Sequence, residues 1–258
     1  MDITLEQYIL NPQFRSNAVL NATAREAIKS DYMSRYDKLM VRERGSIAYE
    51  VFYDEKKNRI FAVFRVPSET VEKFYYDVVF EFLATENISN TENMFKYITK
   101  FYSNDPSFVF TYAHAFNNNG VMIEELRSKM SRKAIKEDAK VRNPYNMIGY
   151  VKTIYFAYLF MQNKGLHNRN RLLATSKPYS QSALLASVVH ADEKVESRIS
   201  AGEKLEKQKK IHKKQEERRK GNDNATKTTG TSIKTTSTTP VKKAGGKFVG
   251  KVGTVKRK

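Results

Sequence analysis

Large apolar residues nearly disappear from the last 38 residues of this chain, and this change limits where a folded core can form. Between Gly221 and Lys258 the large apolar side chains are Ile233, Val241, Phe248, Val249, Val252 and Val255, among nine Thr and six Gly. Such a segment buries too little apolar surface to offset the entropy lost on ordering it. The composition therefore predicts a disordered basic tail over 221–258 and places the core before it.

The net charge is concentrated in the same part of the chain. Residues 203–258 hold 18 Lys and Arg against five Asp and Glu, whereas the preceding 202 residues hold 28 against 23. Residues 191–220 alternate acids with bases and contain few apolar positions, which is typical of a solvent-exposed helix with ion pairs at i,i+4. We expect a charged helix there, weakened at Gly202.

The basic segment supplies the candidate binding residues. Cationic arms bind phosphate backbones through counterion release, without sequence preference, and they also bind other acidic surfaces. A solubilising tail without a dedicated partner stays an alternative, and the peptide around Phe248-Val249 has the pattern of a short docking segment. The candidate contacts with nucleic acid or an acidic partner are Lys209, Lys210, Lys213, Lys214, Arg218, Arg219, Lys220, Lys242, Lys243, Lys247, Lys251, Lys256, Arg257 and Lys258.

Residues 1–45 are interpreted as an N-terminal arm followed by a helix. The arm covers residues 1–15 and has the pattern of a docking segment, with a break at Asn11-Pro12. Its apolar positions are Leu5, Tyr8, Ile9, Leu10 and Phe14. Ser16 is a suitable N-cap for a helix that runs to about Glu43, and Gly45 is a suitable stop.

Residues 46–190 are interpreted as the core domain, which begins with strands. Apolar residues alternate over 47–53 and 60–66 around a polar turn at 54–58, and this pattern predicts a β-hairpin. A third strand is expected over 74–83 and another over 107–116. The spacing within 94–102 fits a strand or a helix equally well.

Helical spacing returns after the turn signal at 117–120. We expect helices over 121–139 and 145–163, and a further one from about residue 179 into the charged stretch. Strands and helices are thus segregated along the chain. This order favours an α+β fold, with an antiparallel sheet of about five strands flanked by helices, a charged C-terminal helix and a disordered basic tail.

Motifs that carry catalytic chemistry are missing from the sequence. It has no Cys, no phosphate-binding glycine loop and no nucleophile elbow. His114 fits a half-buried, hydrogen-bonded residue, and His190 with Asp192 and Glu193 needs further ligands to hold a metal. Adjacent acids on helices face different sides. We therefore expect no enzymatic activity, no cofactor and no metal.

Aromatic residues near lysines allow one further hypothesis. Tyr75, Tyr76, Phe80, Phe82, Tyr97, Phe101 and Tyr102 cluster near Lys73, Lys96 and Lys100. On a sheet face, such residues stack the bases of single-stranded nucleic acid. The competing interpretation is an aromatic-rich sheet core.

Two further features of the sequence limit the location of the protein. No apolar run of about 18 residues is present, which predicts no membrane-spanning helix. The N-terminus MDITLEQYILNPQF lacks the basic start and longer apolar run of a secretory signal. The sequence therefore predicts an intracellular or packaged protein.

Three stretches carry a resemblance to known proteins: Phe101–Ala113 (FYSNDPSFVFTYA), Arg142–Tyr145 (RNPY) and Ile154–Leu159 (IYFAYL). They resemble uncharacterised structural (virion) proteins of tailed bacteriophages with AT-rich genomes, which implies a location in the virion or the host cytoplasm. The resemblance covers about 45–165 and transfers no functional residues. It implies a non-enzymatic structural or assembly protein that is oligomeric in a particle. Its expected partners are other virion or assembly proteins, and DNA as a candidate partner of the arm. The alternative is a nucleic-acid-binding accessory protein acting in replication, transcription or packaging.

Overall fold

The computed structural model describes residues 2–10, 22–84, 92–140, 143 and 146–225, and the side chains of 22–25 and 212–225 lie outside that description. Contacts between Cα atoms divide the chain into two units, Met1–Lys209 and Lys210–Lys258. The sheet and its covering helices belong to the first unit. No helix among the described residues is long and apolar enough to span a bilayer.

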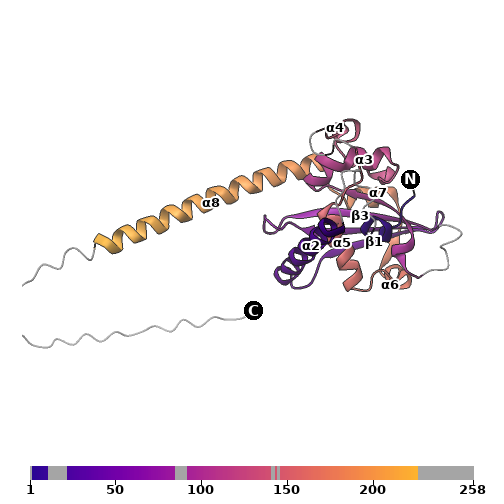
Figure 1. Cartoon of the computed structure of the whole chain (residues 1–258), viewed down its shortest axis with the longest axis horizontal. Coiled ribbons are helices and arrows are strands. Elements are labelled where there is room, and N and C mark those ends of the chain that lie inside the picture. The colour runs from indigo at the N-terminus through magenta and orange to yellow at the C-terminus, as the bar shows by residue number, and fades with distance from the viewer. Residues whose placement is uncertain (1, 11–21, 85–91, 141–142, 144–145, 226–258) are drawn as a thin grey trace, which may run out of the picture. The chain divides into compact units, whose positions relative to one another are not determined.

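The first unit is built on a five-stranded sheet, which confirms the expected α+β class (Figure 1). Its order is β4-β3-β2-β1-β5, with antiparallel pairing except for β5, which runs parallel to β1. The strands are β1 (Ala48–Asp54), β2 (Arg59–Pro67), β3 (Tyr75–Leu83), β4 (Ile98–Ser103) and β5 (Ser176–Pro178).

Helices and tight turns make up the rest of the described chain. The α-helices are α1 (Leu5–Leu10), α2 (Ala22–Arg42), α3 (Ala113–Asn118), α4 (Arg132–Lys136), α5 (Lys152–Asn163), α6 (Arg169–Leu173), α7 (Gln181–Ala186) and α8 (Ala191–Ala225). Three short segments have other helical geometry: η2 (Met94–Lys96), the π-helical η3 (Phe108–Tyr112) and η4 (Glu124–Lys129).

The predicted hairpin is confirmed, and its turn has a clear local cause. Residues 55–58 connect β1 to β2, and Asn58 adopts a φ of 45°, a left-handed conformation that Asn tolerates better than most residues. The carboxylate of Asp54 accepts a hydrogen bond from the Lys57 N–H at 3.3 Å. The strand ends Asp54 and Arg59 therefore lie opposite each other.

One face of the sheet is aromatic and packs under α5. The Phe160 ring of α5 lies 6.2 Å from the Phe64 ring, and the row continues from Phe64 through Phe80 to Phe101. Every member of this row is buried. Helix α2 packs on the same side through contacts of its tyrosines with Phe156. This face contains most of the aromatic core.

The opposite face carries buried charges as well as apolar groups. Arg59 and Glu81 lie on it beneath η4 and the loop before α7, and the ring of Tyr179 from this loop stacks on Phe61 at 5.0 Å. Arg65 and the fully buried Asp77 form a second ion pair at 2.6 Å. Buried ions need partners, so this face depends on correct pairing.

The aromatic side chains proposed to stack nucleic acid belong mainly to the core. Tyr76, Phe80, Phe82, Tyr97, Phe101 and Tyr102 are at most 5% exposed, whereas Tyr75 is 38% exposed. Buried rings cannot meet a base, so the stacking hypothesis is wrong for those six residues. The competing interpretation, an aromatic sheet core, is confirmed.

The strand predicted over 107–116 is wrong, because this segment is helical. The Asp105 carboxylate accepts the Ser107 N–H at 2.6 Å, and Pro106 lies at the entry to the helical turns. These are helix-start signals. The π-helical turn displaces one carbonyl, and Asn143 Nδ2 donates to the Thr111 oxygen at 3.2 Å.

Other boundaries also differ from the expectation. Segment 94–102 combines both alternatives, since η2 precedes β4. The helix expected over 121–139 breaks into η4 and α4, and the one expected over 145–163 begins only at Lys152. Gly165 ends α5 with a φ of 66°, as expected. The helix expected from residue 179 is divided into α7 and α8.

The two ends of the chain agree with the expectation only in part. Leu5, Tyr8 and Ile9 of α1 are buried, and the Tyr8 hydroxyl donates to the Gly149 oxygen at 2.8 Å. Residues 11–21, including the expected cap Ser16, lie outside the described residues. Helix α8 continues through Gly202 to Ala225, five residues into the expected tail. The rest of that tail, 226–258, lies outside the description.

Candidate functional site: cationic surfaces and pockets

The predicted binding residues fall into three groups. Lys209 and Lys210 lie on α8 and are exposed. Lys213, Lys214, Arg218, Arg219 and Lys220 are also helical, but their side chains lie outside the description. Lys242, Lys243, Lys247, Lys251, Lys256, Arg257 and Lys258 fall beyond the described residues. Since Lys210, Lys214 and Arg218 recur every four residues, the helix places these positions on one side.

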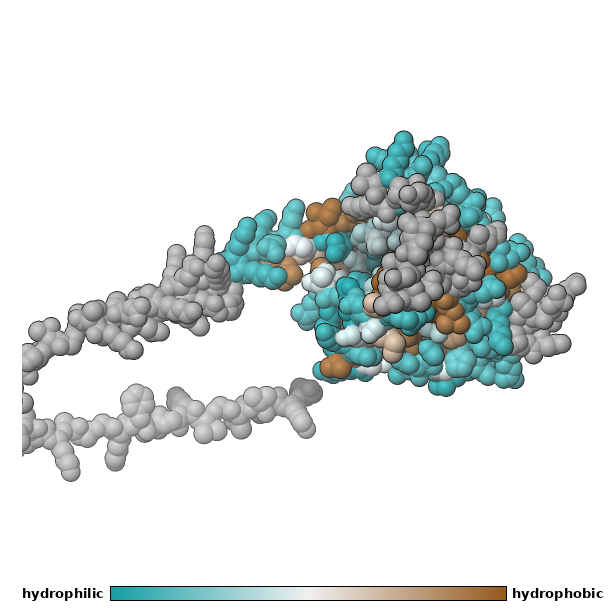
Figure 2. Space-filling view, in the orientation of Figure 1, coloured by the Kyte–Doolittle hydropathy of each residue, from teal (hydrophilic) through white to brown (hydrophobic). Residues whose placement is uncertain are grey.

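Helix α8 changes charge along its length. Residues 191–206 contain three bases and five acids, whereas 207–220 contain eight bases and two acids. The acids of the first turn, Asp192 and Glu193, suit the helix dipole, which favours anions near the N-terminus. Ile199 and Ile211 are each 57% exposed, and the described part of α8 has no continuous apolar stripe (Figure 2).

The beginning of α8 is attached to the first unit. Ala191 is fully buried, and the Lys194 ammonium lies 5.2 Å from the centre of the Phe74 ring. Burial lowers the pKa of Lys194, against the opposing effect of the Asp77 carboxylate. Arg198, one turn further along, lines a pocket of the domain. The first two turns of α8 are thus part of the folded domain.

That pocket has a volume of about 290 Å³ and is formed by six parts of the chain. They are α2, the end of β2 with the loop after it, β3, the loop after β4, α5 and α8. Its charged lining residues are Arg35, Glu69, Asp105, Lys152 and Arg198. The rest of the wall includes hydroxyl groups, three aromatic side chains and two prolines. We call it the Arg198 pocket.

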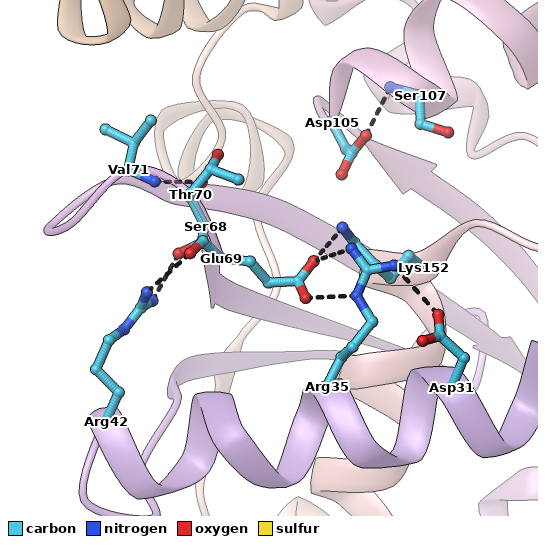
Figure 3. A network of polar contacts seen from close by, with 10 residues as sticks. All are labelled: Asp31, Arg35, Arg42, Ser68, Glu69, Thr70, Val71, Asp105, Ser107 and Lys152. Carbon is cyan, nitrogen blue, oxygen red and sulfur yellow. Dashed lines mark hydrogen bonds and ion pairs between the residues drawn. The ribbon is translucent and has the colours of Figure 1, made fainter. Parts of the chain in front are cut away.

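Glu69 is the central acceptor of the Arg198 pocket (Figure 3). Arg35 holds it with two parallel bonds, Nε to Oε1 at 2.7 Å and Nη2 to Oε2 at 3.0 Å. The Lys152 ammonium forms an ion pair with the same carboxylate. Burial raises the pKa of Glu69, but the hydrogen bonds from Arg35 and Lys152 outweigh it and the pKa is lowered. Glu69 is therefore ionised at neutral pH.

The other charged groups of the pocket are less completely paired. Asp105 is 7% exposed, and burial raises its pKa against the opposing effect of the Ser107 N–H bond. Among the described residues, the buried Nε of Arg198 has no hydrogen-bond partner. The lining alone carries three cations and two carboxylates, an excess of one positive charge, and Asp31 outside the lining pairs with Arg35 at 3.2 Å.

A second and larger cleft lies at the hairpin end of the sheet. It has a volume of about 1180 Å³, and Arg59 lies in its wall between the hairpin, η4 and the loop before α7. Arg59 Nε donates to Asp54 at 2.9 Å, and Nη1 donates to Glu81 at 2.9 Å and to Glu125. Its guanidinium carbon also lies about 5 Å from the rings of Phe61 and Tyr179.

The Arg59 cluster places three carboxylates around one guanidinium. Burial raises the pKa of Glu81, the Glu125 charge raises it further, and Arg59 opposes both. Burial also raises the pKa of Asp54, but the hydrogen bonds from Arg59 and from the Lys57 N–H together outweigh it, so the pKa of that carboxyl is lowered. The other charged residues of the cleft wall are four bases and two acids, which offset the excess of carboxylates around Arg59. The ion pairs of Arg59 therefore stabilise the domain, and the cleft as a whole has little net charge.

Among the described residues, His114 and His190 each contact polar side chains. His114 Nδ1 lies 3.0 Å from Asn146 Oδ1, and its Nε2 lies 3.1 Å from Asn118 Nδ2, which confirms the expected half-buried and hydrogen-bonded residue. His190 approaches Asp192 at 3.9 Å. No group of three His, Asp or Glu side chains gathers within the described ranges to hold a metal ion.

Sequence analysis missed both clusters. Arg35 and Glu69 are 34 residues apart, and Arg59 and Glu125 are 66 apart, so no local motif marks either pair. One weaker sequence signal pointed to the Arg59 cluster. Glu81 stands alone between Phe80 and Phe82 in a buried strand, and an isolated buried acid requires a cation as a partner. No family model, curated protein or solved structure matches the chain.

Proposed function

We propose that the chain is a non-enzymatic structural or assembly protein of a tailed-phage particle, which contacts packaged nucleic acid or an acidic partner through its basic C-terminal segment, 207–258. The resemblance noted in the sequence gives the particle context. The observation that carries the contact is the charge reversal along α8, from an acidic start to eight bases against two acids over 207–220. The nine further bases of 226–258 are not accompanied by any acid.

The chemistry of this segment favours phosphate over an apolar protein surface. An amphipathic helix that docks into a groove presents apolar residues at i, i+3, i+4 and i+7. Residues 207–220 contain one large apolar residue, Ile211. A helix that lacks an apolar face but carries closely spaced cations binds by displacing counterions from a polyanion. Binding should therefore be strong at low salt and independent of nucleotide sequence.

The folded unit then acts as the part that assembles with other particle proteins. In the wall of its large cleft, Arg59 is held by ion pairs within the unit. This internal pairing supports a packing role for the folded unit.

The alternative is an accessory protein whose folded unit also binds nucleic acid. The excess positive charge of the Arg198 pocket favours this alternative. The two functions differ in whether the folded unit contributes to nucleic-acid affinity.

A variant of the full chain tests the proposal. Lys213, Lys214, Arg218, Arg219 and Lys220 are replaced by Gln, a good helix former that removes the charge and keeps the helix propensity. The matched control replaces five exposed bases of the folded unit by Gln: Lys38, Arg132, Lys133, Lys136 and Lys140.

Both variants lose five charges, so net charge alone affects them equally. Fluorescence anisotropy with two duplexes of unrelated sequence measures their affinities. We expect the C-terminal variant to bind at least tenfold more weakly than the control, with no preference between duplexes. Equal affinities for the two variants, or a strong preference for one duplex, would contradict the proposal.

A further inference from the structure

We infer that the Arg198 pocket of the folded unit is a binding site for a phosphate group. This inference does not rest on the proposed role of the basic segment, because its residues lie before residue 199. It concerns a pocket of about 290 Å³, close to the lower end of the roughly 300–1,000 Å³ typical of small-molecule sites. A single oxyanion or a small phosphate ester has a suitable size.

The first argument is the arrangement of the cations. Arg35 comes from α2, Lys152 from α5 and Arg198 from α8, so three separate helices direct bases to one cavity. Glu69 pairs with both Arg35 and Lys152, and Asp31, outside the lining, pairs with Arg35 at 3.2 Å, whereas no carboxylate forms an ion pair with Arg198 among the described residues. A guanidinium with a free donor beside an ammonium is the usual combination for an oxyanion.

The second argument is the unpaired donor of Arg198. A buried donor without a partner costs about 1–3 kcal/mol, so native proteins rarely leave one in place. Arg198 Nε is such a donor within the described residues. Because Arg198 lines the cavity, a bound oxyanion would supply the missing acceptor.

The third argument is that the pocket walls are held in place before any ligand binds. Arg42 of α2 donates to the carbonyl oxygens of Ser68 and Glu69, at 2.6 and 3.2 Å, and thus fixes the loop after β2 (Figure 3). The Val71 N–H donates to Ser68 Oγ at 3.3 Å in the same loop. Asp105, the second acid of the lining besides Glu69, accepts a hydrogen bond from the Ser107 N–H at 2.6 Å. A rigid, pre-formed site loses little entropy on binding.

The test is a titration of the full chain with inorganic phosphate at constant ionic strength. Binding is measured by calorimetry, and the rise in Tm gives a second readout because a ligand of the folded state stabilises it. The variants are Arg198→Gln, Arg198→Lys and the control Lys204→Gln, which removes the charge of an exposed base on the same helix.

We expect wild type and Lys204→Gln to bind phosphate equally and Arg198→Gln to bind roughly tenfold more weakly or worse, since hydrogen bonds to charged groups contribute about 1.5–3 kcal/mol. Arg198→Lys should recover part of the affinity. Arg198 is partly exposed, and unchanged circular dichroism without phosphate will verify that its variants fold. Equal binding by all four proteins, or no binding by wild type, would overturn the inference.

Two sources of the phosphate group are distinguished by oligonucleotides with a 5′-phosphate or a 5′-hydroxyl. A preference for the phosphorylated end that is lost in Arg198→Gln identifies a nucleic-acid terminus. Equal affinity for both ends, together with retained binding of inorganic phosphate, identifies a free phosphate or a small ester. The C-terminal Gln variant described above should keep full phosphate binding, so this inference and the proposed function fail independently.

Discussion

Replacement of Arg59 by Met should destabilise the folded unit strongly. Its side chain is 9% exposed and holds three carboxylates, of which Glu81 is 2% exposed and lies deepest in the sheet. Met fills a similar volume beside Phe61 and Tyr179, so the change removes charge more than packing. Breaking a buried ion pair costs about 3–5 kcal/mol, because it leaves a buried charge without compensation.

The magnitude can be converted into a melting temperature. A change of 1 kcal/mol shifts Tm by roughly 2–4 °C in a domain of this size. We therefore expect Tm at pH 7.5 to fall by roughly 6–20 °C. Differential scanning calorimetry of the full chain measures this change.

The loss of stability caused by Arg59→Met should become smaller at low pH. The pKa shifts of two carboxyl groups determine this direction. The pKa of Glu81 is raised in the folded state, so Glu81 contributes stability at low pH that is lost as pH rises through that pKa. Without Arg59, more stability is lost over the same rise in pH. The pKa of Asp54 is lowered by Arg59, so wild type alone loses that stability as pH falls through it. Both effects reduce the difference between wild type and variant at low pH.

A double-mutant cycle provides the control. Glu81→Gln removes the deepest carboxylate, so Arg59→Met should cost less in that background, by roughly 0.5–3 kcal/mol. A Tm shift below about 3 °C, or a difference that does not change between pH 7.5 and pH 4.5, would refute the pairing argument.

Three further predictions concern single residues. Gly149→Ala should lower stability by about 1–3 kcal/mol, measured by urea unfolding, because its Cβ would lie 2.3 Å from the Tyr112 ring. Tyr102→Phe should cost about 0.5–1.5 kcal/mol in the same assay, through loss of the 3.1 Å bond to the Lys129 oxygen. Glu69→Gln should destabilise the protein at pH 7 and destabilise it less at pH 4. The pKa of Glu69 is lowered in the folded state, so the ionised carboxylate contributes stability that decreases as pH falls through that pKa. Equal losses of stability at both pH values would contradict this role.

The local parts of the fold were predictable from the sequence. The hairpin followed from two alternating runs around a polar turn, and the stop at Gly45 is confirmed by its φ of 71° and its bond to the Met40 oxygen. The alternation failed over 107–116 because the buried residues Phe108, Val109, Ala113 and Phe116 follow helical spacing, while the exposed Phe110 adds an apolar residue that imitates a strand pattern. Asp105-Pro106, a helix-start signal, was the better guide there.

The non-local parts were not predictable. Strand β5 is three residues long and pairs in parallel with β1 across more than 120 residues of sequence. Such a strand has no hydrophobic period. The Arg198 pocket likewise joins six segments, and its charged residues have the sequence pattern of ordinary surface residues. The basic segment was recognisable because composition alone defines it.

The salt dependence of duplex DNA binding by the full chain tests the central claim most directly. If residues 207–258 displace counterions from the phosphate backbone, the logarithm of affinity should fall linearly with the logarithm of salt concentration, with a slope of roughly −0.9 per phosphate contacted. We predict a steep slope for wild type that becomes clearly smaller in the C-terminal Gln variant and changes little in the matched control. A flat response in wild type, or equal slopes in all three proteins, would contradict the account.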